Sequence, residues 1–411
     1  MAKNIVFCAD GTWNGPAQPN ADTDGEGNWP TNVFKLFQNL AGQVIPSSVS
    51  PQDELEKASA SNGTITQTAK YIHGVGDSEN QLAQWLGGSI GAGLITRIVR
   101  GFTFISRNYV PGDKIFITGF SRGAYTARAL AGLIAAKGLL DASKVNLNDK
   151  EQAYQWGSAL WYDWRQSVLQ NSGGLVENLE AECANLPYFL LNPPDPATLI
   201  TNVSMDTIGV WDTVGALGIP DYNKDRMRID VFQFADTKLS TQVSHGFQAL
   251  AVDEQRSDFT PTFWDNDAAR IAQGLFVGCH SDVGGGYCDK DDAPQNLKFE
   301  CGLSDEPLRW MIGNLAAFGV EFAAVPTYAV QPSAIGPAHE PWSSGIWAAL
   351  PQWVRIFPPG YGLSSFVVNR LSAGPVYPDP AVQRSIYAPG NLAAYLNGNE
   401  PAAGVTVIPN C

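Results

Sequence analysis

The stretch "GDKIFITGFSRGAYTARALAGL", residues 112–133, joins an expected strand to an expected helix at a single serine. The β-branched and aromatic run "IFIT" is typical of a buried strand, and it stops at Gly119. The alanine-rich segment after Ser121 predicts a helix to about Lys137, with Gly138 at its C-terminal cap. The sequence therefore places one small hydroxyl on the corner between a strand and a helix.

Residues Gly119, Phe120, Ser121, Arg122 and Gly123 fit the pattern G-x-S-x-G. Such a pattern occurs by chance in glycine-rich chains, but the strand before it and the helix after it are the context that a nucleophile turn requires. Side chains two positions on either side of the serine would collide with the neighbouring strand and helix, which explains the glycines. The hydroxyl then lies at the positive end of the helix, where the backbone N–H of Arg122 is the expected donor to an oxyanion.

A serine nucleophile needs a general base, and the chain has four histidines. In α/β-hydrolases the partners follow in the order serine, acid, histidine, which disfavours His73. His339 lies in a proline-rich region without a preceding strand, and His245 is expected at the start of a helix. His280 directly follows the apolar run "LFVGC" and precedes the glycine turn "SDVGGGY". We predict His280 as the base, with His245 as the alternative.

The acid that orients this histidine is predicted at Asp212, where the apolar strand "IGVWD" ends. Asp206 begins the same strand and would lie away from the site, whereas Asp253 and Asp282 stay open as alternatives. A strand-terminal aspartate also serves as a simple turn former. His280 with Asp282 could be read as a metal pair, but a metal needs three or four ligands and the sequence shows no further cluster, so no metal is expected.

The turn "CADGTWNG" after the first expected strand supplies the other half of an oxyanion cradle, through the backbone N–H of Gly11 or Thr12. A haloacid-dehalogenase phosphatase would need aspartate where this chain has Cys8. A P-loop reading of "GGSIGAGLITR" fails because no Gly-Lys-Ser/Thr follows. Both phosphate-directed interpretations are therefore rejected.

Composition sets the outer limits of the interpretation. The chain has 411 residues, 44% hydrophobic and 16% charged, which suits one large α/β domain or two ordinary ones. The net charge of −14 argues against nucleic-acid binding, while apolar contacts with zwitterionic lipid stay open. Six scattered cysteines form no metal-type pair and are expected to be mostly reduced. The N-terminus lacks a signal-peptide core and no window suits a spanning helix, so a cytoplasmic protein as synthesised is expected.

Expected strands alternate with expected helices along the chain, which predicts a mainly parallel sheet with helices on both faces. In such folds the chemistry collects at the carboxyl ends of the strands, where the candidate residues fall. We expect a single α/β-hydrolase domain over residues 1–411, with core motifs in 4–320. A cap or lid would come from 41–66 (a polar excursion), from 150–200 and from the C-terminal region 321–411, which is expected to be irregular.

One part of that region bears on lipid. Residues 341–366 carry Trp342, Trp347, Trp353 and Phe357 with a single charge, Arg355. If exposed, this segment would be an interfacial lid, because tryptophan favours the boundary between water and acyl chains. If buried, it would be a cap packed on the sheet. The sequence leaves both interpretations open.

Six phrases, "FCADGTWN", "GVGDS", "GDKIFITGFSRGAYTARALAGLI", "GVWDTVGALG", "HGFQALAVDEQRSDFTPTFW" and "VGCHSDVGGGY", together resemble the DUF2235 family, which includes the Tle1-type phospholipase effectors of type VI secretion. The resemblance runs in order from about residue 4 to residue 320. It implies Ser121 as nucleophile, Asp212 as acid and His280 as base, in agreement with the choice made from the residues. It also implies lipid or ester substrates, and a secretion or immunity partner if the chain is an effector.

The resulting hypothesis is a serine hydrolase that cleaves carboxylic esters of phospholipids or other lipids and needs no cofactor. It would make transient contact with a membrane surface and be exported by a route without a signal peptide. Three alternatives stay open: a soluble carboxylesterase for small esters, an acyltransferase, and a non-catalytic binding module on the same scaffold.

Overall fold

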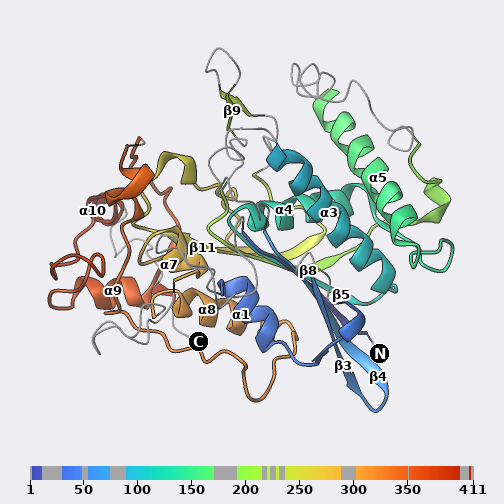
Figure 1. Ribbon diagram of the computed structural model, residues 1–411, viewed down its shortest axis with the longest axis horizontal. Helices are drawn as coiled ribbons and strands as arrows, with labels where there is room; N and C mark the ends of the chain where they lie inside the picture. The colour runs from blue at the N-terminus through green and yellow to red at the C-terminus, as the bar shows by residue number, and fades with distance from the viewer. Residues whose placement is uncertain are drawn as a thin grey trace.

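A ten-stranded sheet runs through the protein, in the order β14-β13-β12-β11-β8-β5-β1-β4-β3-β2 (Figure 1). The computed structural model describes residues 2–11, 30–48, 54–74, 89–170, 192–214, 220–222, 228–230, 237–287, 302–349, 351–398 and 407–408. The strands of the main sheet are β1 (Asn4–Ala9), β2 (Gln43–Val44), β3 (Leu55–Ser61), β4 (Thr64–Ile72), β5 (Lys114–Phe120), β8 (Met205–Trp211), β11 (Val243–Ala251), β12 (Ile271–Phe276), β13 (Gly362–Ser364) and β14 (Val407–Ile408). From β4 to β14 the neighbours pair in parallel, and only β2–β3 and β3–β4 pair antiparallel. The fold is therefore an α/β fold with a mainly parallel sheet, as predicted.

Helices cover both faces of this sheet (Figure 1). The described helices are α1 (Asn32–Asn39), α3 (Ser89–Asn108), α4 (Arg122–Lys137), α5 (Lys150–Gln170), α7 (His280–Gly284), α8 (Asp305–Ala317), α9 (Ser365–Leu371) and α10 (Gly390–Gly398). Two short antiparallel pairs, β6 (Leu139–Leu140) with β7 (Leu199–Ile200) and β9 (Pro220–Tyr222) with β10 (Arg228–Asp230), stand apart from the main sheet. The predicted helix from Ser121 to about Lys137 is confirmed, because α4 ends at Lys137.

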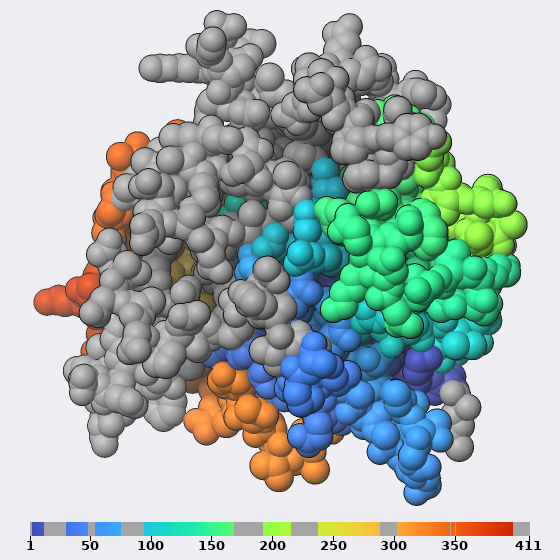
Figure 2. Space-filling model, turned by 45° about the vertical axis from the view of Figure 1, so that its right-hand side comes forward, coloured from blue at the N-terminus to red at the C-terminus, as the bar shows by residue number. Residues whose placement is uncertain are grey.

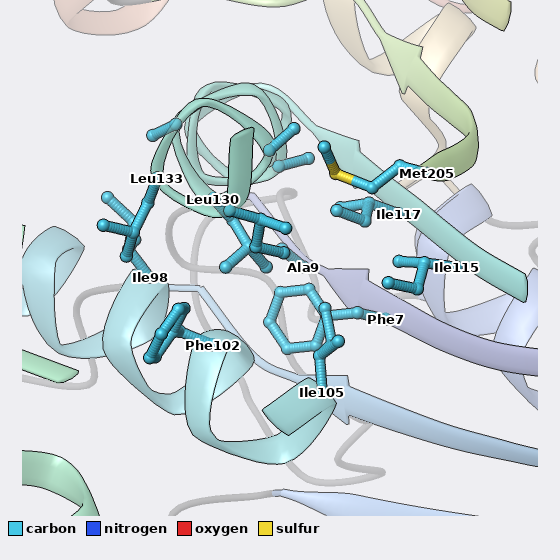
Figure 3. Close-up of a cluster of buried hydrophobic side chains, with 14 of the residues drawn as sticks. Phe7, Ala9, Ile98, Phe102, Ile105, Ile115, Ile117, Leu130, Leu133 and Met205 are labelled. Atoms are coloured by element: carbon cyan, nitrogen blue, oxygen red, sulfur yellow. The ribbon is translucent and has the colours of Figure 1, made fainter. Parts of the chain in front are cut away.

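Alternation along β1 shows how the two faces are built. Ile5, Phe7 and Ala9 point into a core shared with α3, α4 and α5, whereas Val6 and Cys8 point into a second core with α1 and α8. Figure 3 shows the first core between α3, α4 and the strands. Central strands of parallel sheets are buried on both faces in this way. The central strands are thus packed on both faces, which fixes the residues at their ends.

The predicted polar excursion over 41–66 is wrong. Residues 55–61 form β3, which pairs antiparallel with β4 at the edge of the main sheet. The run "LEKASAS" has the alternation of a half-buried edge strand, and Lys57 is drawn inward because its Nζ donates to the carbonyls of Phe37, Gln38 and Leu40 at the end of α1. In Figure 2 the hairpin of β3 and β4 lies beside the segment that follows α8. Gln67 of β4 donates a hydrogen bond to the carbonyl of Glu321 in that segment.

The C-terminal region is also more regular than predicted. β13 and β14 extend the main sheet beyond β12, and a third core packs residues of β11 and β12 against apolar side chains from this region. Those C-terminal side chains are Phe357, Tyr361, Leu363, Val367, Leu392 and Tyr395. The sequence did not indicate these two strands, because β13 and β14 have only three and two residues and lie in a proline-rich region. No helix among the described segments is long and apolar enough to cross a membrane.

Candidate active site

The elbow at Ser121 has the strained geometry that its sequence predicts. Ser121 follows β5 directly, with φ 56° and ψ −124°, and α4 begins at the next residue. A Cβ on Gly119 would lie 2.3 Å from the carbonyl oxygen of Gly123, and a Cβ on Gly123 would lie 2.2 Å from that of Ala9 on β1. Both glycines are thus required by backbone atoms that pass too close for any side chain.

Asp212 directly follows β8, the strand next to β5, at the position level with Ser121. Phe120 of β5 is opposite Trp211 of β8, and the backbone N–H of Ser121 donates to the Trp211 carbonyl at 3.1 Å. Asp212 has φ 41°, and of the four non-glycine residues with positive φ in the described ranges two are Ser121 and Asp212. Such strain persists only where the surrounding structure enforces it, and it concentrates at functional sites.

His280 completes the group from the third element. It begins α7, and its Nδ1 lies 2.5 Å from Oδ2 of Asp212. Its ring packs against Phe120, with centroids 4.5 Å apart, and against Phe259 at 4.8 Å. Because Asp212 is the acceptor at Nδ1, the other ring nitrogen, Nε2, is left with the lone pair of a base.

Two features of this imidazole suit a general base. Burial lowers the pKa of His280 below its ordinary value of 6.5, although the hydrogen bond and charge of Asp212 act in the opposite direction. The ring is therefore neutral at pH 7. Its buried Nε2 finds no hydrogen-bond partner within the described part of the chain, Ser121 included. Catalytic hydrogen bonds of this kind are often long without substrate and tighten when it binds.

Arg355 holds the other side of the Asp212 carboxylate. Its Nη1 donates to Oδ1 at 2.6 Å and its Nη2 to Oδ2 at 2.9 Å, and the backbone N–H of Ala251 adds a bond of 3.0 Å to Oδ1. Burial alone would raise the pKa of Asp212, but the Arg355 charge and the His280 hydrogen bond outweigh it and hold this pKa far below its usual range. Asp212 is therefore a carboxylate at neutral pH.

A second buried ion pair fixes the backbone of His280. Oε2 of Glu254 accepts the His280 N–H at 3.1 Å and the Arg256 Nη2 at 2.8 Å. The Arg256 guanidinium lies 3.8 Å from the Phe259 ring centroid and 5.0 Å from that of Trp347. This stack ties the tryptophan-rich segment to the wall of the site.

The alternative acids have other partners. Asp282 accepts from the backbone N–H of Cys279 at 2.9 Å and pairs with Nδ1 of His339 at 2.6 Å. Asp253 accepts from the backbone N–H of Gly278 at 2.7 Å and from the Tyr387 hydroxyl at 3.1 Å. Both carboxylates thus brace the loop that carries His280.

The remaining histidines and Asp206 lie away from the elbow. His245 is on strand β11 and packs on Phe318 with centroids 4.3 Å apart, so the predicted helix start there is wrong. His73 follows β4, where its carbonyl accepts from Arg97. Asp206 accepts the N–H of Ile115 at 3.1 Å, at the opposite ends of β8 and β5. The structure thus brings His280 to Asp212, at the strand end beside the turn that carries Ser121.

The predicted oxyanion donors are placed in part. Arg122 is the first residue of α4, so its N–H belongs to the first turn, where helix amides lack a carbonyl partner within the helix. The Gly11 N–H donates to Oδ1 of Asp10 at 2.7 Å in this structure. Thr12 lies outside the described residues.

Asp10 itself is buried behind the elbow and had not been singled out by sequence reasoning. It also accepts from the hydroxyls of Thr31 at 2.8 Å and Tyr71 at 2.7 Å. Burial raises the pKa of Asp10 to about 6, although these hydrogen bonds lower it. Arg355 and Glu254 were missed as well. The signal for Arg355 was its position as the single charge in the 26 residues of segment 341–366.

The structure is that of an α/β protein with a strained serine turn after β5 and a buried aspartate–histidine pair at the end of the neighbouring strand. A family model described as "T6SS, Phospholipase effector Tle1-like, catalytic domain" matches residues 3–314. The chain belongs to this family. The description of this family names phospholipase effectors of type VI secretion.

Individual relatives are more distant. A Saccharomyces cerevisiae protein described as "Uncharacterized protein YEL023C" is 27% identical over 258 residues, which cover 62% of this chain and 32% of that protein, so the match spans about a third of the relative. A solved structure of an uncharacterised Pseudomonas aeruginosa protein aligns with a TM-score of 0.39 and 17% identity, over 78% of this chain and 47% of that one. A Tle1 effector bound to the VgrG spike aligns with a TM-score of 0.36 and 17% identity, over 77% and 61% of the two chains.

Proposed function

We propose that this protein hydrolyses carboxylic esters of phospholipids through an acyl-enzyme on Ser121. The observation that carries the proposal is the 2.5 Å contact between His280 Nδ1 and Asp212, at the strand end beside the serine turn. Membership of a phospholipase effector family supports the lipid substrate. The family description also supports delivery by type VI secretion, which would be tested by detecting the protein outside cells that carry an intact secretion apparatus.

In the proposed reaction, Ser121 Oγ attacks the ester carbonyl while His280 Nε2 takes its proton. Backbone N–H groups at the start of α4 hold the oxyanion. The tetrahedral intermediate collapses, and His280 passes the proton to the departing alcohol. Water then repeats the sequence on the acyl-enzyme, which releases the fatty acid and restores the hydroxyl. Asp212 stabilises the imidazolium in both halves, and no cofactor is needed.

The deciding experiment compares Ser121→Ala with wild-type protein. We expect a fluorophosphonate probe to label wild type and not the variant, and hydrolysis of phosphatidylcholine and of a p-nitrophenyl ester to fall at least about 10⁴-fold. Ser372→Ala is the control, because that exposed hydroxyl bonds only the carbonyl of Val368. Labelling that survives Ser121→Ala, or folded wild-type protein that is never labelled, would refute the mechanism and favour a binding module. Activity on the short ester alone would indicate a carboxylesterase.

A further inference from the structure

Arg355 is more deeply built into the site than a surface ion pair would be. Its side chain is 2% exposed and that of Asp212 is fully buried. Besides the two bonds to the carboxylate, Nη1 donates to the carbonyl of Ala251 at 2.8 Å and Nη2 to that of Phe259 at 2.6 Å. The planar guanidinium is thus fixed from both sides, and its fork matches the carboxylate as a lysine could not.

The arrangement leaves the carboxylate no freedom to turn. Each oxygen of Asp212 accepts two bonds, one from Arg355 and one from either His280 or the Ala251 N–H. Without the guanidinium, two single contacts would stay, and the carboxylate could rotate away from Nδ1. Burial would also favour its protonated form, which cannot stabilise an imidazolium.

The backbone just before Arg355 is anchored to the segment that follows β11. Gln352 bridges to Arg256, and the N–H of Trp353 donates to the carbonyl of Gln255 at 2.6 Å. This places the side chain in register with Asp212. Arg355 lies beyond residue 314, where the family model ends, so the segment that follows the matched part supplies this group.

We propose that Arg355 is a positioning residue for the reaction: it acts through Asp212 to hold His280 in the orientation and tautomer that a base at Ser121 requires. The proposal rests on the proposed function and deepens it. It predicts that the region after residue 314 is needed for activity for a chemical reason and not for stability alone.

The test measures kcat, KM and the pH profile of short-ester hydrolysis in Arg355→Met and Arg355→Lys, after thermal melting has shown the folded fraction. In Arg355→Met we expect kcat to fall roughly 10–100-fold with KM nearly unchanged, the range typical of lost outer partners. The acid limb should move to higher pH, because loss of the cation raises the pKa of Asp212 and a protonated carboxyl appears earlier as pH falls. The other charged groups there, Glu254 and Arg256, stay in both variants.

Arg370→Met is the matched control. Arg370 is an equally buried arginine of the same region, but within the described residues its hydrogen bonds go to the carbonyls of Ala334, Gly336 and Tyr377, and none goes to Asp212 or His280. It should lose thermal stability while keeping the wild-type acid limb. A shifted acid limb in this control, or a wild-type kcat and acid limb in folded Arg355→Met, would overturn the proposal.

Arg355→Lys decides the case if the methionine variant does not fold. It keeps the charge and loses the two-point fork, so kcat should fall about tenfold while the acid limb stays in place. A folded lysine variant with wild-type kcat contradicts the positioning role. Ester hydrolysis that survives Ser121→Ala would instead refute the proposed function, so the two failures are distinguishable.

Discussion

At the scale of single residues, close backbone contacts position the nucleophile. Gly123 lets the first turn of α4 lie against the end of β1, where the carbonyls of Ala9 and Asp10 would be 2.2 and 2.5 Å from a Cβ. Backbone atoms cannot swing aside as a side chain can. The turn at Ser121 therefore requires glycine at positions 119 and 123, where no Cβ fits, as much as it requires the serine between them.

Gly123→Ala should accordingly push α4 away from β1. We expect the free energy of unfolding to fall by about 1–3 kcal/mol, as for other overpacked sites, and fluorophosphonate labelling of Ser121 to slow by at least about tenfold. Denaturant titration and labelling kinetics measure the two effects.

The comparison variant is Gly390→Ala at the start of α10, where a Cβ would meet nothing within 4 Å and φ is not positive. It should be neutral or stabilising by up to about 1 kcal/mol, because alanine reduces the entropy of the unfolded chain. Equal destabilisation by both changes would show that close approach to β1 is not the cause.

At the scale of elements, the extended segment 352–357 carries two different faces. Arg355 and Phe357 point inward, while Val354 and Ile356 are 49% and 73% exposed and Trp353 is 47% exposed. The segment is thus buried at Arg355 and Phe357 and exposed at its other apolar side chains, so neither lid nor buried cap describes all of it. The exposed strip, Trp353, Val354 and Ile356, bears no charge and belongs to the segment that reaches Asp212.

We expect this strip to meet the lipid surface. Replacing Trp353, Val354 and Ile356 together by serine should lower hydrolysis of phosphatidylcholine vesicles at least about tenfold, because each loses apolar contact with the bilayer, and tenfold corresponds to about 1.4 kcal/mol. Hydrolysis of a short soluble ester should stay unchanged. Vesicle sedimentation and turnover on both substrates provide the measurement.

Val325→Ser with Ile335→Ser is the control, because these two side chains are 83% and 65% exposed on a different segment. It should leave vesicle hydrolysis intact. If the strip variant keeps full vesicle binding and turnover, the strip is not the lipid contact. If both sets of changes reduce vesicle binding equally, exposed apolar area in general is responsible.

At the scale of the whole molecule, local sequence patterns predicted the parallel sheet and its strand ends, whereas the contacts between distant residues were not predicted. The strand-to-helix corner at Ser121 and the strand end at Asp212 are legible because both depend on neighbours in sequence. The clamp from Arg355 depends on a contact 143 residues away, for which no local pattern exists. Strand β3 was missed because its polar alternation resembles a loop, and β13 was missed because three residues give no period.

The same dependence on distant contacts yields a prediction for the C-terminal region. A chain ending at residue 320 would lose three side-chain contacts to the site and its loop: Arg355 with Asp212, His339 with Asp282, and Tyr387 with Asp253. It would also lose the apolar side chains that the C-terminal region packs onto β11 and β12. At roughly 1.5–3 kcal/mol for each buried side chain, that loss is comparable to the whole stability of a typical domain. We therefore propose that residues 1–411 form one catalytic unit.

We expect the chain 1–320 to show no cooperative thermal transition and no fluorophosphonate labelling. Co-expression with a separate chain 321–411 should restore both, because the lost bonds are all non-covalent. The two chains with Arg355→Met in the second should recover the thermal transition but react slowly with the fluorophosphonate. This result would separate the contribution of residues 321–411 to stability from their contribution to catalysis. Cooperative unfolding and wild-type labelling of the chain 1–320 alone would show that the site is complete without the C-terminal region.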